Sequence, residues 1–415
     1  MALTRPSSPD SQGWQSGTST PRTENSVLFG DLFGDDDFIL VVGGLGYIGS
    51  HTTWELLKAG RSVVIVDNLS NAFRTVLERL QTMLQAHYPD ISQAPLIRFH
   101  NIDYRNVAAM RIVLEMYART PSPERPRPSS IAGVIHFAAY KAVAESVEQP
   151  LRYYANNVAG MIDFCGLLDE FGVKTFVLSS SATVYGELAN KGGRLPEEYC
   201  THATTNWQDA EGRHQTTFGG SSGLTNPYGR TKWMCEAILH DLAASDPEWT
   251  VVALRYFNPI GCDASGHLGE DPRATPNNLM PVVVRVLTGE LEVLDIFGTD
   301  WDTRDGTAIR DFIHVTDLAR GHLAALSATS DKLATGFHSF NLGTGTGHTV
   351  KEVVAAMEGA SGKSIAVRHS ERREGDVAMC IADPKKAATL LGWKTEKTLD
   401  DCCRDICRFL RLLRL

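Results

Sequence analysis

The chain has 415 residues and no run of about 18 apolar residues, so no segment is predicted to span a bilayer. It has only eight cysteines and no Cys-x-x-Cys pair, which argues against a disulfide scaffold. Cys402, Cys403 and Cys407 cluster near the C-terminus without further metal-ligating residues close by, so we expect no metal site and reduced thiols in the cytoplasm. Net basic charge is also missing: 40 Lys and Arg against 49 Asp and Glu give −9. That sign argues against a nucleic-acid partner or an anionic membrane partner.

The first residues lack the composition of a folded segment. Residues 1–28 are rich in Ser, Thr, Pro, Gly and Gln, and the start has neither the apolar stretch of a secretory signal nor the Arg-rich amphipathic pattern of a transit peptide. Such a segment buries too little apolar surface to offset its ordering entropy. We therefore predict a disordered tail over 1–37, ending at the acidic residues that precede Phe38.

Short apolar runs alternate with helical periodicity from residue 38 onward. This alternation predicts an α/β fold with a Rossmann-like, doubly wound parallel sheet. The predicted strands are 38–42, 62–66, 96–99, 133–137, 175–178 and 251–254, and the predicted helices are 50–58, 74–87, 107–118, 151–171 and 228–244.

The pattern becomes irregular beyond residue 258. We expect a Rossmann-like domain over 38–255, and a smaller C-terminal lobe over 256–415 that mainly binds substrate and can interleave with the first domain. A polar stretch rich in Gly, Ser and Thr, near 199–223, is predicted to be a surface insertion beside the substrate cleft.

Three glycines follow the first strand and open the first helix. Gly43, Gly46 and Gly49 form a GxxGxxG pattern in which a tight turn brings the backbone close to a pyrophosphate. The helix N-terminus then offers free N–H groups and the positive end of its dipole. Asp67 ends the second strand, 18 residues after Gly49, where a carboxylate accepts hydrogen bonds from ribose hydroxyls and repels a 2′-phosphate. The cofactor predicted is therefore NAD rather than NADP.

Tyr228 and Lys232 are four residues apart, so they share one face of a helix, and Ser181 ends the fifth strand at the ligand-binding edge. Tyrosine, with a pKa of ~10, is a poor base at neutral pH, and lowering the pKa by ~3 units requires ~4 kcal/mol. One cation at ~4 Å supplies about that much at an effective dielectric of ~20. Lys232 is one cation and an oxidised nicotinamide is another, so we predict that Tyr228 moves a hydroxyl proton with the help of Ser181.

Longer segments carry a resemblance that is more specific than any single motif. They are Gly43–Thr52, Val66–Ser70, Val134–Ser146, Ser179–Gly186, Asn226–Lys232, Arg255–Pro259, Pro276–Pro281, Arg310–His314 and Arg372–Asp376. In this order they resemble the UDP-glucose 4-epimerases, which are extended short-chain dehydrogenase/reductase proteins. The resemblance covers residues 38 to about 410.

The resemblance implies a tightly held NAD that is regenerated in each cycle. Hydride leaves C4 of the sugar, a 4-ketose forms and turns over in the pocket, and hydride returns to the opposite face. By position, Tyr228 is the acid/base, Lys232 binds the nicotinamide ribose and polarises Tyr228, and Ser181 touches the reacting hydroxyl. The resemblance also implies a homodimer formed through 151–171 and 228–244, with Tyr153, Tyr154 and Met161 as candidates either for that interface or for the core.

The resemblance assigns two further groups of residues. The positions expected to contact NAD, besides the three glycines and Lys232, are Tyr47, Ile48, Asp67, Asn68, Asn71, Asp103, Tyr104, Phe137, Lys141, Asn156 and Phe257. Those expected to hold the UDP-sugar, besides Ser181 and Tyr228, are Asn258, Asn278, Leu279, Phe297, Arg310, Arg373, Asp376 and Cys380. Two guanidinium groups in the second set suit a diphosphate.

This chain departs from the family pattern at several positions. Val42, Leu45, Ala139 and Tyr140 differ from the commoner residues around the cofactor loops. Cys380 stands where some relatives have a bulky tyrosine against the sugar. The smaller side chain would leave room for an N-acetyl group, so we hypothesise activity on UDP-GlcNAc and UDP-GalNAc as well.

Other functions remain open on the sequence alone. A UDP-sugar dehydratase or decarboxylase needs an additional acid just after Ser181, where this chain has Ala182 and Thr183. A pentose 4-epimerase, an NAD(H)-releasing dehydrogenase and a catalytically silent NAD-binding regulator are further alternatives. The intact Ser181, Tyr228 and Lys232 argue against the silent regulator.

Overall fold

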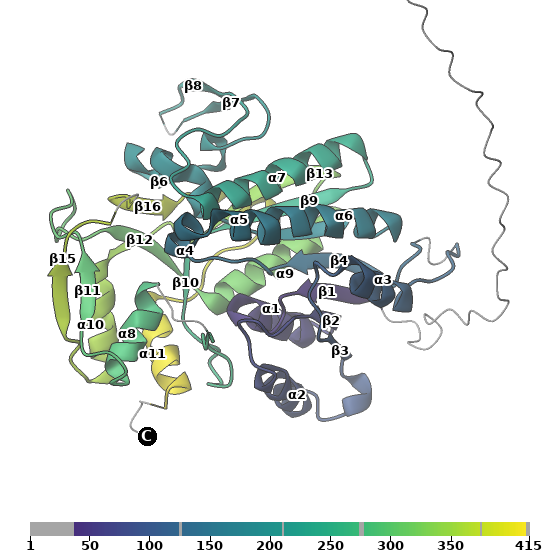
Figure 1. The fold of residues 1–415 in the computed structure, drawn as a ribbon, viewed down its shortest axis with the longest axis horizontal. Coiled ribbons are helices and arrows are strands. Elements are labelled where there is room, and N and C mark those ends of the chain that lie inside the picture. The colour runs from purple at the N-terminus through teal and green to yellow at the C-terminus, as the bar shows by residue number, and fades with distance from the viewer. Residues whose placement is uncertain (1–36, 124–126, 210, 274–277, 374–375, 412–415) are drawn as a thin grey trace, which may run out of the picture.

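A seven-stranded parallel sheet forms the centre of the molecule (Figure 1). The computed structural model describes residues 37–123, 127–209, 211–273, 278–373 and 376–411. The predicted disordered tail therefore lies outside the described residues, except for Asp37, which forms an ion pair with Arg119 at 3.1 Å. The sheet order is β13-β9-β5-β4-β1-β2-β3. Its strands are β1 (Phe38–Val42), β2 (Ser62–Val66), β3 (Ile97–His100), β4 (Ile131–His136), β5 (Thr175–Ser181), β9 (Thr250–Tyr256) and β13 (Gly336–Leu342).

The strand order reverses at β1, as expected for a doubly wound sheet. The chain passes from β1 to β2 and β3 on one side, and then from β4 to β5, β9 and β13 on the other, with every neighbouring pair parallel. In such sheets ligands bind outside the carboxyl ends of the strands where the order reverses. The crevice for a cofactor is thus expected between the ends of β1 and β4.

Helices cover both faces of the sheet because alternate strand residues point in opposite directions. Ile39 and Val41 of β1 belong to the hydrophobic cluster formed with one group of helices, whereas Leu40 and Val42 belong to the cluster on the other face. The first group is α1 (Tyr47–Lys58), α2 (Thr75–His87) and α9 (Val315–Asp331). The second group is α3 (Val107–Met116), α6 (Gly160–Glu170) and α7 (Pro227–Ser245).

The helix predicted over 151–171 is interrupted. The structure forms α4 (Val143–Glu148), α5 (Pro150–Tyr153), a π-helical segment (Tyr154–Ala159) and then α6. Tyr153 and Met161, suggested for a dimer interface, are 0% and 1% exposed and belong to the chain's own core. π-Helical segments are frequent at functional sites, and this one carries Asn156.

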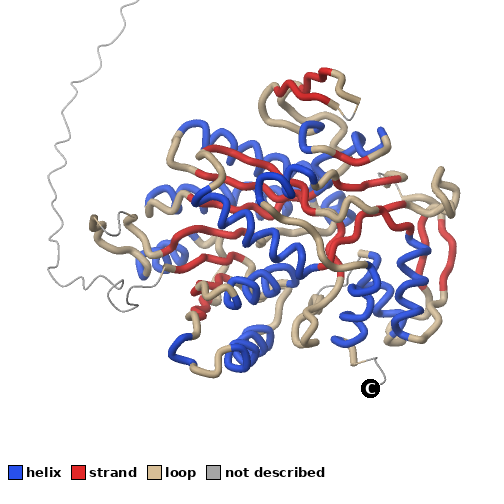
Figure 2. The backbone as a smooth tube through the Cα atoms, turned by 180° about the vertical axis from the view of Figure 1, so that it is seen from behind, coloured by secondary structure: helices blue, strands red, loops and turns tan. Residues whose placement is uncertain are grey.

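The seventh strand and α9 lie beyond the boundary predicted at residue 255. The sequence analysis missed β13 because its apolar pattern is broken by His338, Ser339 and Asn341. It assigned no helix to the region of α9, which lies beyond residue 258, where the pattern becomes irregular. The chain therefore leaves the main sheet after β9, builds part of a second lobe and returns. Figure 2 shows the two regions from behind.

The second lobe has its own hydrophobic cluster. Its helices are α8 (Leu279–Leu287), α10 (Val350–Ser361) and α11 (Leu399–Phe409). Its strands are β6 (Arg194–Leu195), β10 (Asn258–Ile260), β11 (Leu294–Phe297), β12 (Ile309–His314), β14 (Gly347–Thr349), β15 (Val367–Ser370) and β16 (Met379–Ala382). Strands β10, β12, β16 and β6 form one sheet, with β14 antiparallel to β12, while β11 pairs with β15.

The predicted insertion contains a small antiparallel hairpin, β7 (Thr205–Gln208) and β8 (His214–Thr217), visible beyond α7 in Figure 1. His202, just before the hairpin, packs its ring against Trp233 of α7 and Phe337 of β13, with centroids 5.2 and 5.4 Å apart. The insertion ends at Gly223, whose carbonyl accepts the backbone N–H of Glu187 at 2.8 Å. Thus the segment starts on the outer side of α7 and ends near the first turn of that helix.

Candidate active site

The glycine loop has the geometry expected at a pyrophosphate. Gly43 has φ +78°, and a Cβ on Gly49 would lie 2.1 Å from the carbonyl oxygen of Gly43, so neither position tolerates a side chain. A Cβ on Gly46 would meet only that same oxygen, at 3.4 Å. Gly46 therefore leaves open space in front of α1, whose N-terminus has no side-chain cap. The free N–H groups there include those of Tyr47 and Ile48.

Asp67 joins the glycine loop to the loop after β2. Its two carboxylate oxygens accept the backbone N–H groups of Leu45 at 3.0 Å and Leu69 at 2.9 Å. Burial raises the pKa of Asp67, against the effect of these two hydrogen bonds. Because each carboxylate oxygen has a second lone pair, Asp67 can still accept ribose hydroxyls. The glycine loop, the N-terminus of α1 and the Asp67 carboxylate together fit an NAD molecule.

The other positions expected to contact NAD differ in how far they are exposed. Asn68 donates to Asp103 at 3.0 Å, and Asn71 lies further along the same loop. Lys141 follows β4 and is half exposed, with an ion pair to Glu270 at 3.1 Å. The remaining members have lower exposure: Tyr104, Phe137, Asn156 and Phe257. Among these, Tyr104 donates its hydroxyl to the carbonyl of Asn156 at 2.5 Å, so the phenol is held within the protein.

The predicted proton-transfer residues converge at the ends of β5 and α7. Tyr228 and Ser181 are hydrogen-bonded to each other, and the ammonium group of Lys232 donates to the carbonyl of Ser179. Asn226 caps α7 by accepting the N–H of Gly229 at 2.8 Å, and Pro227 occupies the first turn. This firm helix start fixes the turn that carries Tyr228.

Burial dominates the electrostatics of Tyr228 and Lys232 in the protein without a cofactor. Burial raises the pKa of Tyr228 to about 12, although the hydrogen bond from Ser181 lowers it. Burial also lowers the pKa of Lys232 to about 8. In the protein without a cofactor, desolvation of the phenolate outweighs any effect of Lys232, whose ammonium group donates to the carbonyl of Ser179. A second positive charge beside the phenol is needed.

Thr183 orients the hydroxyl of Ser181. The sequence analysis noted this position only because a dehydratase or decarboxylase would have an acid there. Ser181 Oγ accepts the Thr183 backbone N–H at 3.2 Å and its hydroxyl at 3.0 Å. A hydroxyl has two acceptor lone pairs and one donor proton. With both lone pairs in use, the Ser181 proton is directed to Tyr228, where it stabilises the phenolate.

A buried ionic network supports the two strands and the helix of this site. Arg255 and Glu236, both with fully buried side chains, form an ion pair at 2.7 Å, and Glu236 also accepts the hydroxyl of Ser180 and the ring N–H of His202. Burial alone would raise the pKa of Glu236, but Arg255 and His202 bring it down to about 2. Glu236 is therefore an anion that links α7 to the residue next to Ser181.

The residues expected to hold the UDP moiety gather in the second lobe. Arg373 stacks on Phe297 at 4.3 Å, and Asp376 lies 3.4 Å from Arg373 and 3.7 Å from Arg310. Cys380 of β16 pairs in register with Arg310 of β12. Five predicted residues from three strands and a loop thus form one cluster with two guanidinium groups.

Three further predicted residues lie at the beginnings of elements. Asn258 starts β10 and is exposed, while Asn278 precedes α8 without capping it through its side chain. Leu279 is the first residue of α8. Pro276, Asn277, Glu374 and Gly375, which belong to the same sequence motifs, lie outside the described residues.

Comparison with known proteins agrees with this geometry. The model of the NAD dependent epimerase/dehydratase family matches residues 39–343. The chain belongs to that family. It is 45% identical to a UDP-glucose 4-epimerase of Dictyostelium discoideum over 370 residues, which are 89% of this chain and 94% of that protein.

Solved structures of the same family share the fold. The UDP-glucose 4-epimerase of Bifidobacterium longum, in complex with NAD⁺ and UDP, is 39% identical with a TM-score of 0.75, covering 90% of this chain and 98% of that one. The UDP-Glc/GlcNAc 4-epimerase of Campylobacter jejuni is 30% identical with a TM-score of 0.68, covering 91% and 99%. The doubly wound parallel sheet and the NAD cofactor predicted from the sequence are confirmed.

Proposed function

We propose that this protein is an NAD-dependent 4-epimerase that interconverts UDP-glucose and UDP-galactose. The observation that carries the proposal is the meeting of Tyr228, Ser181 and Lys232 at the strand ends next to a complete dinucleotide-binding loop. NAD, when bound, supplies the hydride acceptor and donor together with a positive ring. Extensive similarity to UDP-glucose 4-epimerases of other organisms supports this substrate class.

The protein's own residues account for the proton transfer. Tyr228, as a phenolate, removes the proton of the sugar C4 hydroxyl, and the Ser181 proton stabilises that negative charge. Lys232, with its pKa lowered to about 8, is still mostly an ammonium ion at neutral pH. It holds the carbonyl end of β5 and places a positive charge beside the cofactor crevice. After the sugar has turned, Tyr228 returns the proton to the C4 oxygen, so that the hydroxyl is restored when the opposite face of the 4-keto carbon is reduced.

A sugar dehydratase or decarboxylase would need an acid that this site does not offer beside Ser181. Elimination across a sugar needs a general acid beside Ser181, and the structure places there Ala182 and the hydroxyl of Thr183, which is engaged with Ser181. A UDP-pentose is smaller than a UDP-hexose because it lacks the substituent at C5, so it is the second substrate class to be assayed. A side-by-side assay of UDP-galactose, UDP-GlcNAc and UDP-arabinose decides among the sugars, and turnover of none of them contradicts the proposal.

We also propose that N-acetylated sugars are substrates. Cys380 is a small side chain beside Arg310, at the expected sugar end of the site. We expect the wild-type protein to interconvert UDP-GlcNAc and UDP-GalNAc. Replacing Cys380 by Tyr fills that space, so the ratio of kcat/KM for UDP-GalNAc to that for UDP-galactose should fall by at least about tenfold, the effect of a steric misfit of ~1.4 kcal/mol.

Cys380→Ser is the matched control for this experiment because it keeps the side chain small. The ratio should stay near the wild-type value in that variant. Turnover of UDP-galactose without any turnover of UDP-GlcNAc by the wild-type protein would contradict the broader specificity and leave the epimerase assignment intact.

We further propose a homodimer through α4, α5, α6 and α7, which lie next to one another in Figure 1. These helices expose five large apolar side chains: Val143 (44%), Val147 (62%), Leu151 (81%), Ile162 (52%) and Met234 (37%). Exposed apolar groups on neighbouring helices favour a protein partner. A mass in solution equal to the 45.4 kDa chain, at micromolar concentration, would contradict the dimer.

We place the protein in the cytoplasm. All eight cysteines are free, which suits a reducing compartment. The described part of the chain has neither a helix long and apolar enough to cross a membrane nor a cluster of side chains that could hold a metal ion.

A further inference from the structure

Residues 261–273, which follow β10, cross from the second lobe back to the cofactor domain. We call this segment the strap. Its own fold is a tight turn in which the Asp263 N–H donates to the carbonyl of Leu268 at 2.9 Å, and Asp263 also accepts the N–H of Ser265 at 2.9 Å. Leu268 is 1% exposed and belongs to the hydrophobic cluster under α1 and α2. The strap is therefore anchored in the core of the domain it crosses.

Both ends of the strap contact the cofactor domain. At its start, the carbonyl of Gly261 accepts the hydroxyl of Tyr47, the first residue of α1, at 2.7 Å. At its end, the Arg273 Nε donates to the carbonyl of Ala72 at 2.8 Å, and the guanidinium stacks on Phe73 with 4.2 Å to the ring centroid. These contacts join residues about 200 positions apart in the chain.

A third contact lies between these two. Glu270, whose side chain is 15% exposed, forms an ion pair with Lys141 at 3.1 Å. Lys141 follows β4, whereas Tyr47 follows β1 and Ala72 follows β2. The strap therefore touches the loops after three adjacent strands, and these loops surround the point where the strand order reverses. That point is the mouth of the dinucleotide crevice.

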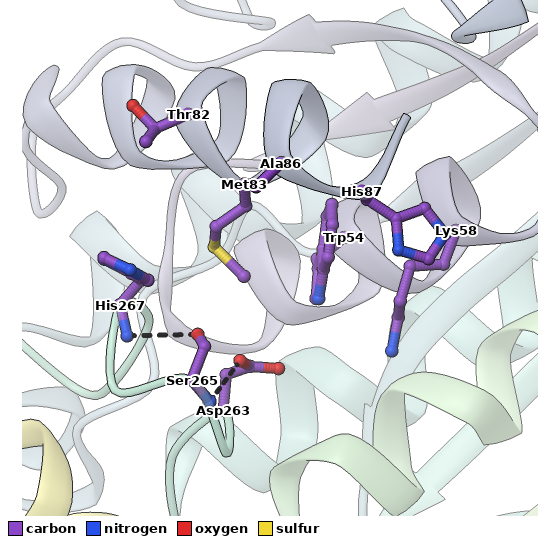
Figure 3. Close-up of a pocket in the computed structure, with 9 residues that line it drawn as sticks. All are labelled: Trp54, Lys58, Thr82, Met83, Ala86, His87, Asp263, Ser265 and His267. Atoms are coloured by element: carbon purple, nitrogen blue, oxygen red, sulfur yellow. Dashed lines mark hydrogen bonds between the residues drawn. The ribbon is translucent and has the colours of Figure 1, made fainter. Parts of the chain in front are cut away.

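The middle of the strap is less tightly packed than its ends. Figure 3 shows Asp263, Ser265 and His267 of the turn facing Trp54 of α1 and Met83 of α2 across a cavity of about 440 Å³. Besides the packing of Leu268, the turn contacts α2 through the carbonyl of His267, which accepts a hydrogen bond from the Arg79 guanidinium at 3.4 Å. Glu270 and Arg273 make the charged-group contacts between the strap and the loops at the mouth of the crevice.

We propose that the strap retains NAD in the crevice, with Glu270 and Arg273 as the positioning residues that hold it shut. This inference rests on the proposed function. A cycle that removes hydride from C4 and returns it requires the same coenzyme at both steps, so slow departure of the coenzyme keeps the enzyme active. Neither residue needs to touch NAD, because each acts on a loop beside it: Glu270 through Lys141, and Arg273 through the loop that follows Asp67.

Release of bound NAD from the purified holoenzyme tests this role. The variants are Arg273→Ala, which removes the hydrogen bond and the ring contact, and Glu270→Gln, which keeps the shape and removes the charge facing Lys141. The protein is mixed with a glycohydrolase that destroys free NAD, and the NAD remaining per chain is followed by absorbance after acid release. We expect each variant to lose NAD about tenfold faster than the wild type, as for loss of one charged contact.

Arg285→Ala and Glu290→Gln are the matched controls, since these residues form an exposed ion pair on and just after α8 at 3.3 Å. Both should release NAD at the wild-type rate. Wild-type release from Arg273→Ala and Glu270→Gln would overturn the strap assignment, and so would equally fast release from the controls. A wild-type preparation that holds no NAD or has no turnover would instead contradict the proposed function itself.

Discussion

Replacing Tyr228 by Phe should lower kcat by roughly 10²–10⁴-fold, the usual effect of losing an acid/base group. The variant loses the phenol that is hydrogen-bonded to Ser181 and keeps the aromatic ring. NAD content should stay at the wild-type level because the glycine loop, Asp67 and the strap are untouched. The measurement is kcat with UDP-galactose, together with the NAD released per chain.

Tyr88→Phe is the matched control for this variant. Its hydroxyl donates to the carbonyl of Leu57 at 2.9 Å, away from the strand ends that carry the site. Removing that hydroxyl should leave turnover unchanged. Turnover of Tyr228→Phe within about threefold of the wild type, less than ~1 kcal/mol in activation free energy, would remove Tyr228 from the mechanism.

Replacing Glu236 by Ala should destabilise the protein by about 3–5 kcal/mol, since it leaves a buried charge without its partner. Arg255 is 0% exposed, and its remaining neighbours are the hydroxyl of Tyr185 and the carbonyls of Glu197 and Cys200. Those groups accept hydrogen bonds but do not neutralise a guanidinium ion. Urea unfolding at pH 7 measures the change, because the Glu236 pKa of about 2 keeps the wild-type carboxylate ionised there.

An exposed pair provides the comparison. Arg285 and Glu290 are 27% and 63% exposed, and Glu290→Ala should change stability by no more than about 1 kcal/mol. If Glu236→Ala unfolded at the same urea concentration as Glu290→Ala, the Arg255–Glu236 pair would not be a support of the site.

The parts of the site that depend on local sequence were predictable. Gly43 and Gly49 occupy positions where a Cβ meets backbone atoms, and this constraint appears in the sequence as a fixed spacing of glycines. Asp67 follows from the strand length, because the second strand ends one residue before it. Tyr228 and Lys232 follow from helical periodicity. Such features involve neighbours in the chain, so the pattern of residue types is sufficient.

The parts that depend on distant contacts could not be predicted. Glu270 meets Lys141 across 129 positions, and nothing in the residues around Glu270 indicates that partner. Strand β13 was missed because its polar residues serve a buried network: the Asn341 side chain accepts the hydroxyl of Tyr185 at 2.7 Å. The raised pKa of Tyr228 in the protein without a cofactor could not be predicted either. It depends on the balance between desolvation and charge, and only the folded environment fixes that balance.

Transfer of the C4 hydrogen is the most direct test of the account. UDP-galactose carrying deuterium at C4 is turned over in ordinary water, and the label in the product UDP-glucose is measured by mass spectrometry. If the proton moves through Tyr228 while the hydrogen of C4 travels as hydride to a retained NAD and back, the product keeps its deuterium and turnover shows a primary isotope effect. Loss of the label to solvent at a rate comparable to epimerisation would contradict the account.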